Sequence, residues 1–256
     1  MNALLQQLPP ISLAEMSCVK LMNRTDTKFL TTVQGLHELL QMAQGDYYVQ
    51  EINGNRLATY QTVYFDTPQY AMFYEHQHGH ANRQKLRFRS YVNSGLLFME
   101  VKMKNNHGRT KKKRIAVDDL NLQDTTKADF LSCYLRYADA PLIPTVRNNF
   151  ERITLVNRAK TERLTIDIDV CFHGMQTGKD YDMGALVVIE LKRDGLVASP
   201  VLAMLRELRI HPHGFSKYCF GLALTTPGLR LNRMKPKMTD VRKLLDKPQL
   251  QPIWTF

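Results

Sequence analysis

The stretch RQKLRFRSYV, residues 83–92, alternates cationic and apolar side chains with a period of two. In an extended strand this alternation places Lys85, Arg87 and Arg89 on one face and the apolar residues on the other. The next stretch, LLFMEVKMK at 96–104, repeats the pattern. Together the two stretches predict adjacent strands with one apolar and one charged face.

Six further stretches show the same alternation, or the β-branched and aromatic enrichment of strands. They are TDTKFLT (25–31), LATYQTVYFDT (57–67), KKKRIAVDD (111–119), NNFERITLV (148–156), ERLTIDIDV (162–170) and GALVVIELKRD (184–194). Helices are predicted at 34–44, 69–76, 127–136, 199–209 and near 216–222. Because the strands follow one another rather than alternate with helices, the sequence favours a mainly antiparallel β architecture with helices added, an α+β fold.

The charge of the chain is concentrated in one segment. The 256 residues carry a net charge of +11, with 44% hydrophobic and 23% charged residues, a composition that excludes a disordered or collagen-like chain. Between Arg83 and Arg114 there are eleven basic residues and a single acidic one, Glu100. We expect one domain at 1–225 followed by a basic C-terminal tail at 226–256.

The chain shows none of the usual signals for membrane insertion or export. Its apolar runs fall short of the ~20 residues that a membrane span needs. The start, MNALLQQLPP, has neither a basic leader nor a long apolar stretch, so a cytoplasmic protein is expected. The cysteines Cys18, Cys133, Cys171 and Cys219 lack CxxC spacing and are expected to be reduced, semi-buried core residues.

The charged strand faces predict an anionic ligand. Like charges on adjacent strands repel one another unless a polyanion or divalent metals lie between them. The alternative is an ordinary half-exposed sheet with a solvated charged face. A single nucleoside triphosphate brings about four negative charges, and the excess of cations favours a longer polyanion. The positions expected to face inward are the cations Lys28, Arg87, Arg89, Lys102, Lys104, Lys112, Arg114, Arg152, Arg163, Lys192 and Lys217, and the carboxylates Asp26, Glu100, Asp167, Asp169 and Glu190.

The order of the motifs resembles a known family. TDTKF, YFDT, KLRFRSY, FMEVK, KKR, FER, ERLTID, VVIELK and FSKY, taken in this order, are similar to the catalytic domain of the vacuolar transporter chaperone (VTC) type. That domain is the polyphosphate polymerase branch of the triphosphate tunnel metalloenzyme (CYTH-like) superfamily. The resemblance runs from about Arg24 to Phe220. It implies a closed barrel of eight antiparallel strands around a charged lumen, with helices outside.

The resemblance also implies a set of site residues. The motif Arg24-x-Asp26-x-Lys28 replaces the wider E-x-E-x-K signature and suits the polymerase branch. Lys112 is the match to the lysine of a K-x-R strand, although Lys111 and Lys113 leave its register open. The implied catalytic residues are Lys28, Ser216 and Lys217, the phosphate-binding residues are Arg87, Arg89, Lys102, Lys112, Arg114, Arg152 and Arg163, and Glu190 is the implied ligand of Mn²⁺ or Mg²⁺.

The function implied by the resemblance is transfer of the γ-phosphoryl group of ATP to a growing polyphosphate chain. Phosphoryl transfer has a loose transition state, so positioned cations and a metal suffice and no nucleophilic side chain is needed. Two alternatives stay open: a hydrolase of tripolyphosphate or nucleoside triphosphate on the same scaffold, and a non-catalytic polyphosphate-binding module. The expected partners are ATP and polyphosphate or another triphosphate-containing anion, with a membrane protein as a further candidate.

Two other motifs suggest competing functions. His76, His78 and His80 stand at a spacing of two and could form a metal site on a strand, but Gly79 and the preceding helical pattern favour a polar loop. Aromatic residues beside the cations, Phe88 among them, would suit single-stranded nucleic acid. Phe88 falls on the face opposite the arginines, so nucleic acid is not an expected partner.

Overall fold

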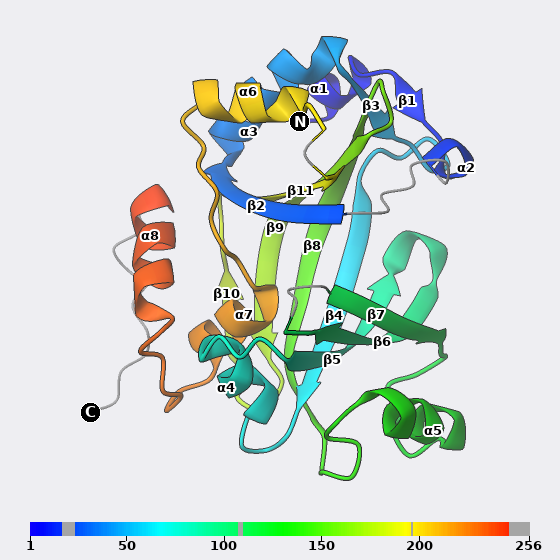
Figure 1. Ribbon diagram of the computed structural model, residues 1–256, viewed down its shortest axis with the longest axis vertical. Helices are drawn as coiled ribbons and strands as arrows, with labels where there is room; N and C mark the ends of the chain where they lie inside the picture. Colours follow the sequence, from blue (N-terminus) through cyan, green and yellow to red (C-terminus); the bar gives the residue numbers. More distant parts are fainter. Residues whose placement is uncertain (17–23, 107–109, 196, 246–256) are drawn as a thin grey trace.

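The computed structural model describes residues 1–16, 24–106, 110–195 and 197–245. A single sheet dominates it, and all eight predicted strands are present (Figure 1). The neighbouring strands of this sheet are antiparallel, which confirms the mainly antiparallel α+β class. Their order is β2 (Arg24–Thr32), β11 (Leu186–Asp194), β9 (Glu162–Gly174), β8 (Ile143–Asn157), β4 (Ala58–Asp66), β5 (Arg83–Tyr91), β6 (Leu96–Lys104) and β7 (Thr110–Ala116).

Three short strands that the sequence did not predict extend the sheet at its margins. β3 (Tyr47–Gln50) pairs with β8 and, in parallel, with β1 (Pro10–Ile11). β10 (Asp180–Asp182) pairs with β9.

The closed barrel is not confirmed. β2 and β7 end the strand order, and no pairing between them occurs in the described part of the chain. The free edge of β2 is partly occupied, because Phe29 forms a bridge with Pro212 and the Lys28 carbonyl accepts a hydrogen bond from the His213 amide. β7 is exposed along almost its whole length and carries a run of lysines, a feature that opposes edge pairing.

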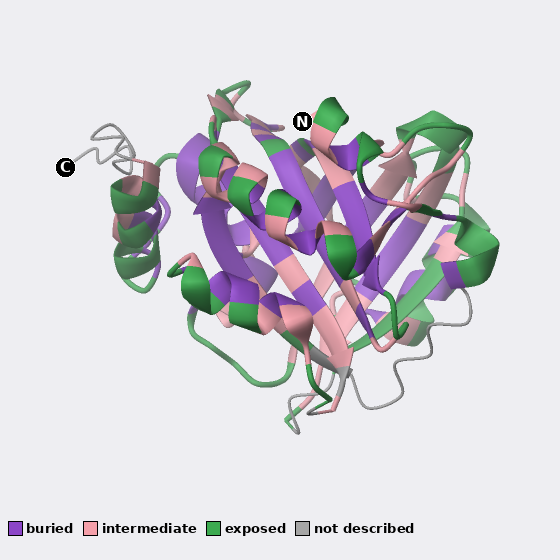
Figure 2. Cartoon of the chain, turned by 90° about the horizontal axis from the view of Figure 1, so that it is seen from above, coloured by how far each residue is buried: buried purple, intermediate pink, exposed green. Residues whose placement is uncertain are grey.

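Helices cover the outer face of the sheet. α1 (Asn2–Gln6), α3 (Val33–Met42) and α6 (Pro200–Glu207) pack on β2, β11, β9 and β8, and α5 (Thr125–Tyr134) packs on β4, β5 and β6. Figure 2 shows buried strands beneath helices with exposed outer sides. Thr32 and Asp124 cap α3 and α5, accepting hydrogen bonds from the amides of Gly35 and Lys127.

The inner face of the sheet, defined here as the face that carries Arg87, Arg152 and Glu190, is apolar at one end. There α7 (Lys217–Thr225) packs against β8 and β9, in a buried cluster that includes Val146 and Phe172. α4 (Ala71–Gln77) and α8 (Lys235–Leu245) add to this cluster. The charged lining that the resemblance implies therefore does not extend to this end, because α7 occupies it.

The remaining short elements lie at the periphery. They are α2 (Leu13–Met16) and the 3₁₀ turns η1 (Ala43–Gly45) and η2 (Val92–Ser94). The sequence predicted neither α1, α2 nor α8.

A bulge in β9 overturns one further prediction. Asp169 has a φ of +52°, and the pairing with β8 shifts register near it. The alternation therefore changes phase: Ile168 packs in the outer cluster and Val170 in the inner one. Asp169 is exposed rather than part of the inner face.

The cysteines only partly fit their prediction. Cys133 is exposed, Cys171 is half-buried and Cys219 is buried, and all three are free. Cys18 lies outside the described residues. None of the helices in the ranges given above has the length and apolarity to span a membrane.

Candidate functional site

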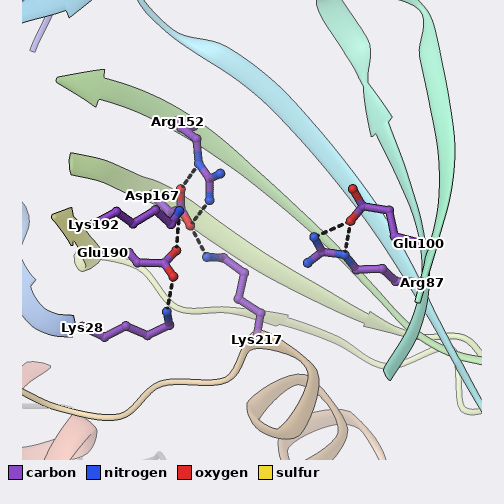
Figure 3. A network of polar contacts seen from close by, with 8 residues as sticks. All are labelled: Lys28, Arg87, Glu100, Arg152, Asp167, Glu190, Lys192 and Lys217. Carbon is purple, nitrogen blue, oxygen red and sulfur yellow. Dashed lines mark hydrogen bonds and ion pairs between the residues drawn. The ribbon is translucent and has the colours of Figure 1, made fainter. Parts of the chain in front are cut away.

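The charged end of the inner face contains an ion-pair cluster centred on Glu190 of β11 (Figure 3). Lys28 lies directly opposite on β2, with its Nζ 2.7 Å from Glu190 Oε1. Lys192, two residues further along β11, places its Nζ 3.1 Å from Oε2. The two lysines outweigh the effect of burial, which alone would raise the pKa of Glu190, and hold that pKa well below its usual range. Glu190 is therefore an anion at all physiological pH values.

A second carboxylate, Asp167 of β9, joins the sheet to α7. Arg152 of β8 donates to it through two nitrogens, at 2.6 and 2.8 Å. Lys217, the first residue of α7, donates to Asp167 Oδ2. Burial opposes ionisation of this carboxyl, but Arg152 and Lys217 hold its pKa far below the usual value. The start of α7 is thus fixed against β8 and β9.

Glu100 of β6 forms the third cluster, on the other part of the inner face (Figure 3). It is fully buried and accepts hydrogen bonds from Arg87 Nε at 2.8 Å and Arg87 Nη2 at 2.5 Å. Lys112 Nζ of β7 lies 3.0 Å from its other oxygen. Burial alone would raise the pKa of Glu100, but Arg87, Arg89 and Lys112 lower it to about 2.

Beside Glu100 runs a row of three lysines, of which Lys112 contacts the Glu100 carboxylate. Lys85, Lys102 and Lys112 stand directly opposite one another on β5, β6 and β7. Lys85 Nζ donates to Ser216 Oγ at 3.0 Å, and Ser216 caps α7 by accepting from the Cys219 amide. For Lys102, no hydrogen bond or ion pair is seen within the described ranges. The neighbouring Arg87 charge, burial and Arg89 hold the pKa of Lys102 well below its usual value.

The other predicted phosphate-binding residues also belong to this face. Arg89 Nε is 3.4 Å from Thr62 Oγ1, and burial together with Arg87 and Arg152 lowers its pKa to about 10. Arg163 stands opposite Lys192 on the neighbouring strand. Arg114 pairs in register with Glu100.

The register of β7 resolves which of its lysines faces inward. Lys112 and Arg114 stand opposite Lys102 and Glu100. Lys111 and Lys113 stand on the opposite face.

Sequence reasoning missed several polar groups of this face. Asn148 is 1% exposed and stands opposite Thr62, and neither of its side-chain polar atoms has a hydrogen-bond partner among the described residues. Thr165 is buried opposite Glu190, and its hydroxyl also has no hydrogen-bond partner in the part of the chain that the structure describes. Such buried groups need a partner, which a bound ligand could supply. Asn148 precedes Phe150 by two residues, so the period-two rule could have identified it.

One carboxylate of this face, Glu190, has the chemistry of a Mg²⁺ ligand. No group of three His, Cys, Asp or Glu side chains suited to a metal is present among the residues that the structure describes. Mg²⁺ commonly takes one or two protein carboxylates and completes its shell with phosphate oxygens and water. Glu190, which stands opposite the Thr165 hydroxyl, would be such a ligand once a metal displaces the Lys28 and Lys192 ammonium groups from its oxygens.

The histidine motif does not form a metal site in the described structure. His76 lies in α4, His78 is the residue that ends this helix, and His80 follows it. On a strand, His76, His78 and His80 would lie on one face. In a helix, residues two apart point in different directions, so His76 does not share a face with His78.

The family model of the VTC domain matches residues 23–226. The chain belongs to the VTC domain family. All predicted site residues from Lys28 to Lys217 lie within the matched segment, and α8 follows it. No curated protein matches the chain.

Solved structures similar to this VTC-domain chain include three proteins of low sequence identity. A candidate adenylyl cyclase from Hippeastrum, described as having a dominant triphosphatase activity, is 15% identical with a TM-score of 0.45 and covers 77% of this chain and 93% of its own. A candidate adenylate cyclase from Vibrio parahaemolyticus is 13% identical, with a TM-score of 0.42 and coverages of 77% and 96%. A protein from Pyrococcus horikoshii OT3 is 12% identical, with a TM-score of 0.43 and coverages of 76% and 96%.

Proposed function

We propose that this VTC-domain protein is a polyphosphate polymerase that transfers the γ-phosphoryl group of ATP to a growing polyphosphate chain. The observation that carries the proposal is the row Lys85, Lys102 and Lys112, three lysines in register on adjacent strands, of which only Lys112 contacts a carboxylate, Glu100, within the described residues. Such a row is unfavourable in the free protein and favourable around a chain of phosphates. Family membership supports the same choice of ligand.

The proposed reaction uses the cations for positioning and charge neutralisation. A terminal oxygen of the polyphosphate chain forms a bond to the γ-phosphorus, the bond from that phosphorus to the β–γ bridging oxygen breaks, and ADP leaves. Arginine forks such as those of Arg87 and Arg152 suit phosphate oxygens. We assign Lys28, Ser216 and Lys217 to the transferring phosphoryl group, because Lys28 contacts Glu190 and Lys217 contacts Asp167, two carboxylates on adjacent strands of the inner face (Figure 3).

A divalent metal completes the proposed site. Glu190 would hold Mn²⁺ or Mg²⁺, which when bound offsets phosphate charge during transfer. Phosphates lying between Lys28 on β2 and Lys112 on β7 would also draw together the two ends of the strand order, so we propose that the closed lumen is a property of the ligand-bound protein. ATP as donor fits a cytoplasmic setting, and a membrane protein that receives the polymer is a further proposed partner.

The decisive experiment is a primer-extension assay. Purified full-length chain is incubated with ATP, Mn²⁺ and a short polyphosphate primer, and the expected products are acid-labile chains longer than the primer together with ADP. Release of free phosphate without chain growth would show that the protein is a triphosphate hydrolase rather than a polymerase. Tight binding of polyphosphate, with neither longer chains nor free phosphate formed, would show that the protein is a non-catalytic binding module.

A further inference from the structure

Four aromatic side chains form a continuous row across the inner face. Phe150 of β8, Tyr60 of β4, Tyr91 of β5 and Phe98 of β6 come from four adjacent strands, and we call them the aromatic belt. Tyr60 stands opposite both Phe150 and Tyr91 in register. The ring centroids are 5.2 Å apart for Tyr60 and Phe150, 5.0 Å for Tyr60 and Tyr91, and 5.8 Å for Tyr91 and Phe98.

The aromatic belt lies among the phosphate-binding cations. Arg152 and Arg89 lie over the Tyr60 ring at 4.9 and 5.4 Å from its centroid. Arg114 lies over the Phe98 ring at 4.5 Å. Phe150 is buried, but Tyr60, Tyr91 and Phe98 are half-buried and keep part of their surface accessible.

A bare polyphosphate gains nothing from this arrangement. The face of an aromatic ring carries partial negative charge and does not attract phosphate oxygens. A nucleobase, in contrast, stacks on aromatic rings and on arginine planes. The opposite end of the cationic surface, formed by Arg83, Lys85 and Lys104, differs: the ring near Lys85 there is that of the fully buried Tyr218.

Strand geometry matches the length of a nucleotide. Phe98 and Lys102 both face inward on β6 and are four residues apart, which corresponds to about 13 Å along a strand. That span is comparable with an extended nucleoside triphosphate. A base at Tyr91 and Phe98 would thus place its terminal phosphates beside Lys102.

We propose that the exposed part of the aromatic belt, Tyr91 and Phe98, is a nucleobase-binding platform that fixes the direction of ATP. The base stacks at this end, the triphosphate runs past Arg87 toward Lys102, and the polyphosphate chain occupies the end formed by Arg83, Lys85 and Lys104. This inference rests on the proposed triphosphate binding but concerns the base alone. The competing role for the rings is to hold Arg89 and Arg114 in place.

A comparison of ligands on the unmodified protein tests the platform first. Calorimetry with ATP, ribose 5-triphosphate and inorganic tripolyphosphate separates the base from the phosphates. Since stacking of one base typically changes affinity about tenfold or more, ATP should bind about tenfold more tightly than ribose 5-triphosphate. Equal affinities would overturn the platform and leave the proposed function intact. Binding of none of the three would overturn the proposed function and the platform with it.

Substitutions then locate the platform. Tyr91→Leu combined with Phe98→Leu should weaken ATP binding about tenfold and leave tripolyphosphate affinity within about twofold, a result that also shows the variant is folded. Tyr48→Leu is the matched control, because Tyr48 pairs with Arg158 at 5.1 Å away from this face, and it should change neither. The contrary result is an equal loss of affinity for ATP and tripolyphosphate, with the single variants Tyr91→Leu and Phe98→Leu still folded. It would show that the rings only hold the arginines in place and would overturn the platform.

Discussion

At the scale of single residues, a substitution of Glu190 tests the proposed metal binding separately from anion binding. Glu190→Gln removes the negative charge that would hold the metal but keeps the side-chain shape, so turnover should fall at least about a hundredfold. Affinity for metal-free polyphosphate should persist, because Lys28 and Lys192 lose a competing anion. Glu151→Gln is the control, since Glu151 accepts a hydrogen bond from Thr59 on the other face. A parallel fall in turnover and in metal-free affinity would contradict the metal assignment.

The titration of Lys192 predicts opposite pH trends for stability and binding. Burial lowers the pKa of Lys192 from the usual 10.5 to about 8, with Arg152 and Arg163 adding to the shift and Glu190 opposing it. Between these pH values the unfolded chain binds more protons at this residue, so its contribution to the free energy of unfolding increases as pH rises. A polyanion prefers the charged lysine, so tripolyphosphate affinity should fall over the same interval.

Urea unfolding and calorimetry below pH 8 and near pH 10 measure the two trends. Lys192→Met is the reference, because the difference between it and the unmodified protein isolates this residue from the other titrating groups. Stability and affinity that change in the same direction in this difference would contradict the prediction.

At the scale of elements, the position of α7 depends on Gly221. A Cβ there would lie 2.7 Å from Phe172 Cδ1 and 2.8 Å from Val146 Cγ2, both in buried side chains of the sheet. Gly221→Ala should therefore lower the free energy of unfolding by about 1–3 kcal/mol and reduce turnover, because α7 begins at Lys217. Gly45→Ala, where a Cβ meets nothing within 4 Å, should be neutral. Urea midpoints and initial rates check both, and unchanged turnover in a destabilised Gly221→Ala would mean that α7 does not position Lys217.

At the scale of the whole molecule, the ligand should relieve the repulsion within the inner face. A ligand that binds only the folded chain adds about 2.7 kcal/mol at a hundredfold excess over Kd. Tripolyphosphate should thus raise the Tm by several degrees, and far more than sulfate at equal ionic strength. Arg87→Ala combined with Arg89→Ala should remove this specific shift. A double variant with the full shift would show that these arginines do not bind the phosphates.

Local pattern explains why the strands and the inward residues could be predicted from the sequence. Several strands alternate with a period of two over much of their length. The outer helices cover apolar positions such as Ile166 and Ile189, so the charged positions between them turn inward. The packing of α7 on the inner face could not be predicted from the sequence. Its residues are buried on all sides, so their periodicity does not indicate which surface of the sheet the helix contacts. The bulge at Asp169 depends on a backbone conformation that no local pattern reveals.

Contacts between distant segments were equally inaccessible. The bidentate pairing of Arg152 with Asp167 needs the register of β8 on β9, and the aromatic belt brings Tyr60 beside Phe150 across a wide sequence separation. These details follow from tertiary packing rather than from the composition of any one strand.

Under the proposed polymerase function, the unpaired ends of the strand order affect how long a product chain stays bound. Within the described residues no backbone ladder connects β2 to β7, so parting these two strands breaks no hydrogen bonds between them. A polymer lying along the inner face is then retained by its ionic contacts and need not be drawn out end first. Because such contacts weaken steeply as salt rises, a polymerase of this kind should release its product sooner, and make shorter chains, as ionic strength increases.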